Sequence, residues 1–129
     1  MAKPYHLVER TYEFSKSVVL FINAHQFQRL QYSVVDQLLR SATSIAANVI
    51  EGRSGNSRKN LLFFLSIALR SANETKYWLR LVGDTMDVRK SELVSLQKEA
   101  DEISRILAKS IITLKKNTCV VTERNTFQY

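Results

Sequence analysis

Apolar residues in the last third of the chain recur at intervals of three and four positions, which is the pattern of one face of a helix packed in a bundle. The positions are Leu93, Leu96, Ala100, Ile103, Leu107, Ile111 and Leu114. A strand would alternate every second residue, so the spacing excludes one here. It predicts a helix over residues 91–117, which needs other helices to cover its apolar face.

Three further segments carry the same kind of pattern and supply those helices. In residues 5–24 the apolar positions are Leu7, Tyr12, Phe14, Val18, Phe21 and Ile22. In residues 33–51 they are Val34, Leu38, Ala42, Ile45 and Val49. Residues 57–82 follow as a third helix. Ser33 and Asp36 resemble a capping box at one start, and Ser57 is the expected N-cap of another.

Glycine and proline are scarce, with three and one copies in 129 residues, which favours a few long helices over a β-rich fold. We expect Gly52 and Gly83 to end helices in a left-handed conformation. Residues 118–129 have no apolar period and are expected to form a loose C-terminal tail. Short connections force neighbouring helices to run antiparallel. The sequence therefore predicts an all-α, antiparallel up-down-up-down four-helix bundle over residues 1–117.

The histidines and the cysteine of this chain do not stand at the spacings that metal sites or disulfides require. His6 and His25 are the only histidines, and neither stands three residues after a glutamate, as di-iron bundles require. Cys119 has no second cysteine, which excludes a disulfide within the chain. We expect no catalytic, cofactor or metal site, no membrane span and a cytoplasmic location.

Polar residues form a stripe on each of the two central helices. The stripes contain Arg40, Ser44, Asn48 and Glu51 on one helix, and Ser71, Glu74 and Trp78 on the next. Two interpretations are open: a small polar binding site, or a buried hydrogen-bond network that fixes helix register. We favour the structural network, in which Glu51 and Glu74 are buried.

The run from Leu61 to Leu69 is apolar at eight of nine positions, more than one helix face needs. The excess predicts a second buried face, either a contact between subunits or the surroundings of a central helix. For a subunit contact the candidates are Leu62, Phe63, Phe64 and Leu69.

Basic residues gather at one end of the predicted bundle, and the formal net charge is +7. The members of this end are Lys3, Arg10, Arg53, Arg58, Lys59, Lys109, Lys115 and Lys116, and the opposite end has Asp84, Asp87, Glu92 and Glu99. Cations at a helix start oppose the helix dipole, so Arg53, Arg58 and Lys59 are the least explained by stability. Binding of phosphates and simple solubility are both open interpretations.

Three elements resemble a known family: residues 37–52, with Asn48, Glu51 and Gly52; residues 57–59; and residues 64–79, with Ser71 and Glu74. Together they are similar to the four-helix-bundle proteins encoded in intervening sequences of bacterial 23S ribosomal RNA genes, often labelled ribosomal proteins. Relatives include accessory proteins of diversity-generating retroelements. The resemblance implies a homo-oligomer, a pentamer by comparison with those relatives, with a role near RNA or DNA.

The leading hypothesis is a non-enzymatic oligomeric adaptor that binds the RNA or DNA backbone through Arg53, Arg58, Lys59, Lys115 and Lys116. The alternative is a protein-interaction module that docks a partner enzyme and has no direct nucleic-acid role.

Overall fold

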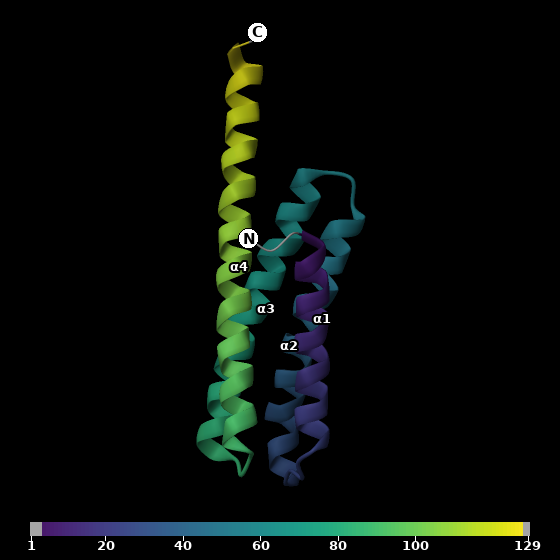
Figure 1. The fold of residues 1–129 in the computed structure, drawn as a ribbon, viewed down its shortest axis with the longest axis vertical. Coiled ribbons are helices and arrows are strands. Elements are labelled where there is room, and N and C mark those ends of the chain that lie inside the picture. The colour runs from purple at the N-terminus through teal and green to yellow at the C-terminus, as the bar shows by residue number, and fades with distance from the viewer. Residues whose placement is uncertain (1–3, 128–129) are drawn as a thin grey trace.

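The computed structural model describes the backbone of residues 4–127 and the side chains of residues 6–117. Within this range the chain forms α1 (Pro4–Asn23), a short 3-10 helix η1 (Arg29–Gln31), α2 (Tyr32–Ser54), α3 (Arg58–Thr85) and α4 (Lys90–Phe127). Each helix packs on the next, and α4 also contacts α1. Figure 1 shows successive helices running in opposite directions. The predicted all-α four-helix bundle is confirmed.

The core lies on the bundle axis and draws on all four helices. Its large, fully buried aliphatic side chains are Val18, Leu38, Ile45, Val49, Leu79, Val82, Ile103 and Leu107. The apolar positions that predicted the last helix line this core, with Leu114 half-buried at its margin. Tyr12 does not belong to the buried face of α1, since it is 52% exposed.

The prediction that two glycines end helices was wrong. Helix α2 continues through Gly52 to Ser54, α3 continues through Gly83 to Thr85, and no glycine in the described residues has a positive φ. A Cβ at Gly52 would lie 3.0 Å from the Cβ of Phe64, an atom that no rotamer change can move away. Gly52 is therefore a point of close approach between α2 and α3.

The two predicted helix starts had different outcomes. Ser57 caps α3 as expected, because its Oγ accepts a 3.0 Å hydrogen bond from the Asn60 backbone N–H. The Ser33 capping box was wrong: α2 begins at Tyr32 without a side-chain cap. The chain enters α2 through η1, where the Gln28 backbone N–H donates to the Gln31 side chain at 2.9 Å.

Helix α4 extends beyond the last residue of its apolar stripe, Leu114. Residues 118–127, expected to form a loose tail, continue the helix to Phe127, while residues 128–129 lie outside the described range. No glycine or proline follows Gly83, so no residue there breaks the helix. Figure 1 shows why the period stops: α4 projects past the turn between α2 and α3, where no other helix packs on it. None of the described helices is long and apolar enough to cross a membrane.

Candidate nucleic-acid interface

The turn between α2 and α3 lies at the level of the C-terminal half of α4, at the same end of the bundle as the start of α1 (Figure 1). The exposed cations of these segments are Arg53, Arg58, Lys59, Lys109, Lys115 and Lys116, which we call the basic end. The five residues predicted to bind nucleic acid all lie on exposed parts of these elements. Lys3, also expected here, lies outside the described residues.

None of the six cations of the basic end is within ion-pair distance of an acidic side chain among the described residues. Arg58 and Lys59 occupy the first turn of α3, which contains no acidic residue. A positively charged side chain at the N-terminus of a helix, the positive end of its dipole, lowers stability by about 0.3–1 kcal/mol. Helix stability therefore does not account for Arg58 and Lys59. The expectation was wrong for Arg53, which lies in the last turn of α2, where the helix dipole favours a cation.

Arg10 does not contribute free charge to the basic end. Its guanidinium bonds both carboxylate oxygens of Glu99, at 2.9 and 2.6 Å, and also bonds Glu102. The hydrogen bonding that Arg10 donates to Glu99 is the main reason that the pKa of Arg10 is raised above its ordinary value. Arg10 was assigned by sequence to the basic end and Glu99 to the opposite end, but the structure pairs the two residues across the α1–α4 seam.

The predicted polar network forms only in part. The Ser71 hydroxyl donates to the Ser44 hydroxyl at 2.9 Å, and the Asn48 amide donates to the Ser44 hydroxyl at 2.9 Å and to the Ser44 carbonyl at 2.8 Å. A second link, which sequence reasoning missed, joins the hydroxyls of Thr75 and Ser41 at 3.0 Å. Ser41 precedes Ser44 by three residues and Thr75 follows Ser71 by four, so helical spacing from the predicted pair would have found them.

The charged members of the predicted network lie outside it. Glu51 and Glu74 are exposed, which contradicts the expectation that both are buried. Glu74 accepts a 3.1 Å hydrogen bond from the indole N–H of Trp78, one turn away on the same helix. Arg40 pairs with Asp36 at 2.7 Å on the surface of α2, and this hydrogen bond raises the pKa of Arg40. The α2–α3 seam is thus closed by short hydroxyl side chains.

The apolar run of α3 divides between the core and the surface. Leu62 and Leu69 pack against the core and are half-buried, as is Phe64. Phe63 is 58% exposed and stacks edge-on against Phe64, with ring centroids 5.1 Å apart. Tyr77, also 58% exposed, stands two heptads after Phe63 and so projects from the same face of α3. This aromatic face is available for contact with another chain.

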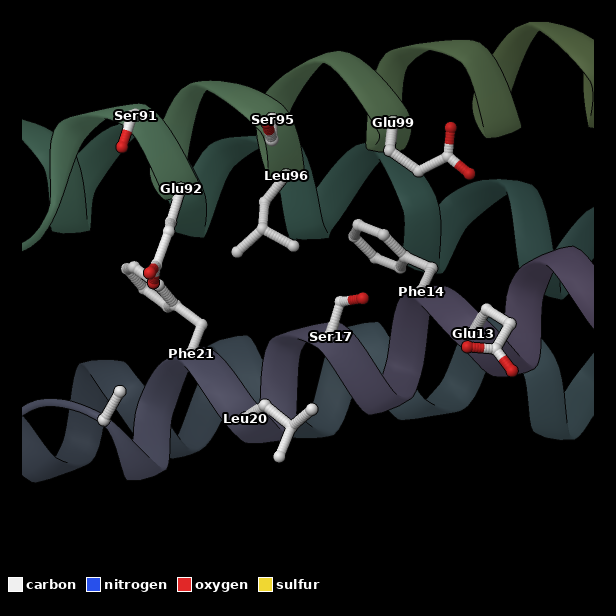
Figure 2. Close-up of a pocket in the computed structure, with 11 residues that line it drawn as sticks. Glu13, Phe14, Ser17, Leu20, Phe21, Ser91, Glu92, Ser95, Leu96 and Glu99 are labelled. Carbon is white, nitrogen blue, oxygen red and sulfur yellow. The ribbon is translucent and has the colours of Figure 1, made fainter.

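A different surface lies on the opposite side, between α1 and the first half of α4. It is an open groove of about 780 Å³. Figure 2 shows Phe14, Phe21 and Leu96 extending into the space between the two helices. Its lining includes the carboxylates of Glu13, Glu92 and Glu99 and no cation. Each of these carboxylates is paired with a cation outside the lining, Lys16, Arg89 and Arg10 in turn. The described lining of the groove therefore offers a phosphate no uncompensated positive charge.

Comparison with known proteins gives a family and a fold. A family model described as 23S rRNA-intervening sequence protein matches residues 3–109. A protein of unknown function from the S23 ribosomal protein family of Bacteroides thetaiotaomicron is 31% identical in sequence, and its crystal structure matches with a TM-score of 0.72. The match covers 85% of this chain and 98% of the Bacteroides chain. No curated protein matches the chain.

Proposed function

The chain belongs to the family of 23S rRNA-intervening sequence proteins, and from this membership and its basic end we propose that it is a non-enzymatic oligomeric adaptor that binds the phosphate backbone of RNA or DNA. The observation that carries the proposal is the placement of Arg58 and Lys59, exposed and without ion-pair partners at a helix start that disfavours them. The proposal implies action in the cytoplasm, where ribosomal RNA is found.

The chemistry of the basic end suits phosphates more than bases. Arginine and lysine bind phosphate oxygens through charge-assisted hydrogen bonds. Arg53 and Arg58 lie on either side of the exposed turn at residues 55–57, where a nucleic-acid strand can approach them from solvent. Affinity then comes from counterion release and carries little sequence preference. Several copies in one assembly would multiply weak contacts into a useful avidity.

Fluorescence anisotropy with labelled RNA and DNA of unrelated sequences tests the proposal. The affinity should fall by about 0.7–0.9 log units per log unit of salt for each phosphate neutralised. Arg58→Glu with Lys59→Glu should abolish binding. The matched control, Lys16→Glu with Lys98→Glu, makes the same change in formal charge outside the basic end and should retain most of the affinity. Equal losses in both double variants would mean that only net charge matters.

We also propose that the adaptor self-associates through the aromatic face of α3, with five copies as the resemblance to retroelement accessory proteins implies. Phe63 and Tyr77 are large exposed aromatic residues, which are enriched where proteins meet. Light scattering should give a mass several times the 14.9 kDa of one chain. Phe63→Glu should return the monomer mass, whereas a wild-type monomer at micromolar concentration would exclude the assembly.

The same aromatic face supports the second candidate function, the docking of a partner protein. The two candidates differ in what the basic end does. If wild-type protein binds neither RNA nor DNA at about 50 mM salt, where phosphate contacts are strong, the basic end is a solvated surface and the docking function replaces the adaptor.

A further inference from the structure

An apolar cavity opens at the basic end, between all four helices. Its volume is about 460 Å³, within the range of about 300–1,000 Å³ typical of small-molecule sites. The aliphatic walls are Leu7, Val49, Leu61, Leu65, Ile106 and Leu114. Leu7, Val49 and Leu65 are also buried core residues, so the cavity reaches from the surface to the core of the bundle.

Three cations belong to the lining of the cavity: Arg10, Arg53 and Lys109. Arg10 is neutralised by Glu99 and Glu102 across the α1–α4 seam. Arg53 and Lys109 are exposed and have no ion-pair partner among the described residues. An apolar interior thus meets two uncompensated positive charges from different helices, α2 and α4.

A nucleobase does not suit this cavity. Proteins bind unpaired bases by stacking them on aromatic rings and by hydrogen bonding their edges. Among the residues whose side chains the structure describes, the lining contains no aromatic side chain, and its neutral polar side chains are Ser110 and Thr113. The Thr113 hydroxyl already donates to the Lys109 carbonyl at 3.0 Å. The walls offer an aliphatic chain dispersion contacts, and they offer a base almost nothing that would orient it.

We propose that this cavity binds a free fatty acid, with the alkyl chain between the aliphatic walls and the carboxylate at Arg53 and Lys109. The proposal shares Arg53 with the nucleic-acid surface, but the two can be tested separately, because Arg58 and Lys59, on which nucleic-acid binding depends most, are not part of the cavity wall. The aliphatic walls bind the alkyl chain and the two cations bind the carboxylate, so the cavity selects for both parts of the ligand.

Isothermal titration of the wild-type protein with straight-chain carboxylates, from octanoate to tetradecanoate below their micelle concentrations, provides the test. Each added methylene should tighten binding about fourfold until the cavity is full, after which affinity levels off. Alkyltrimethylammonium ions of equal length should bind at least about tenfold more weakly, since two cations at the mouth repel them. Affinity that is independent of chain length, or equal for both head groups, would overturn the proposal.

Two variants separate the walls from the mouth. Leu114→Trp adds volume to a half-buried wall position and should weaken dodecanoate binding at least about tenfold while thermal unfolding is unchanged. Arg53→Gln with Lys109→Gln should weaken carboxylate binding but keep the dependence on chain length. The matched control is Lys115→Gln with Lys116→Gln, which removes two cations of the basic end that do not line the cavity. Unchanged binding in Leu114→Trp, or equal losses in both cation pairs, would contradict the assignment.

Two further experiments show whether fatty-acid binding is separate from nucleic-acid binding and from binding to a membrane surface. Arg58→Glu with Lys59→Glu should keep fatty-acid binding, so its result is separable from that of the nucleic-acid proposal. Sedimentation with vesicles of phosphatidylglycerol distinguishes a free acid from a membrane surface. Protein that binds these vesicles and fails to bind monomeric dodecanoate would overturn the fatty-acid site.

Discussion

The seam between α2 and α3 and the seam between α1 and α4 are built from different side chains. Between α2 and α3, hydroxyls meet directly, Ser44 with Ser71 and Ser41 with Thr75, at 2.9 and 3.0 Å. Such short side chains reach each other only if the two backbones are close. Between α1 and α4 the link is made by long side chains, Arg10 with Glu99, and an open groove of about 780 Å³ lies beside it.

The difference shows how one bundle combines a rigid pair with a more accommodating one. Closely packed small residues leave no space for rearrangement, whereas a seam with a groove tolerates changes of side-chain volume. The turn between α2 and α3, which carries Arg58 and Lys59, is thus held by the tighter seam. The seam holds the backbone that carries these cations, so less backbone freedom is lost when a phosphate binds.

The largest effect we predict is that of added volume in the tight seam. Ser41 is 4% exposed and its hydroxyl lies between α2 and α3. Ser41→Leu should lower the free energy of unfolding by about 3 kcal/mol, because overpacking forces the two helices apart. Urea denaturation followed by circular dichroism measures the change.

The same substitution in the groove is the control. Ser17 lines the α1–α4 groove, as Figure 2 shows, and its side chain is exposed. Ser17→Leu should change the free energy of unfolding by no more than about 0.5 kcal/mol. Similar losses for Ser17→Leu and Ser41→Leu would show that the two seams do not differ in tightness.

A smaller effect is expected from the hydroxyl pair itself. The Thr75 hydroxyl lies 2.7 Å from the Ser71 carbonyl and 3.0 Å from the Ser41 hydroxyl. Thr75→Val keeps the shape and removes these bonds, and Ser41 retains its bond to the Leu38 carbonyl. We expect a loss of about 1 kcal/mol in the free energy of unfolding. A double-mutant cycle with Ser41→Ala should show coupling between the two positions, and purely additive losses would mean that the hydrogen bond contributes nothing.

Sequence patterns predicted the fold well because the bundle depends on apolar periodicity. The spacing from Leu93 to Leu114 identified the helix and its buried face without any knowledge of its neighbours. Helix ends were predicted less well. Gly52 fits a helix end and also fits a close contact between helices, and only the position of Phe64 in space distinguishes the two. The extension of α4 has no apolar period because it has no neighbour, so the pattern could not reveal it.

The candidate site was predictable to the extent that it follows from topology. Alternating helices bring Arg53, Arg58 and Lys109 to one end regardless of side-chain detail. The pairing of Arg10 with Glu99 and the exposure of Glu51 depend on the rotation of each helix about its axis. That rotation is set by packing of the whole core, and a single polar stripe does not determine it.

The ion pair of the looser seam should contribute less than the hydroxyl pair. Arg10 and Glu99 have side chains 33% and 32% exposed, so water screens their attraction. Arg10→Met keeps most of the aliphatic stem and should lower the free energy of unfolding by about 0.5–1 kcal/mol at low salt, and by less at high salt. Denaturation at two ionic strengths measures both. The exposed pair of Arg80 with Asp84 is the control, and Arg80→Met should have almost no effect.

The smallest effect concerns Glu51, for which burial was expected and exposure is found. Its carboxylate has no ion pair among the described residues, and it stands one turn before the end of α2 at Ser54. A negative charge near a helix C-terminus opposes the dipole, and alanine is the better helix former. Glu51→Ala should therefore raise the free energy of unfolding by a few tenths of a kcal/mol, about 0.3, as measured by urea denaturation of dilute protein. A loss of about 3 kcal/mol, the result expected for a buried charge, would contradict the exposed placement. If that loss appeared only at concentrations where copies associate, it would place Glu51 in a contact between chains.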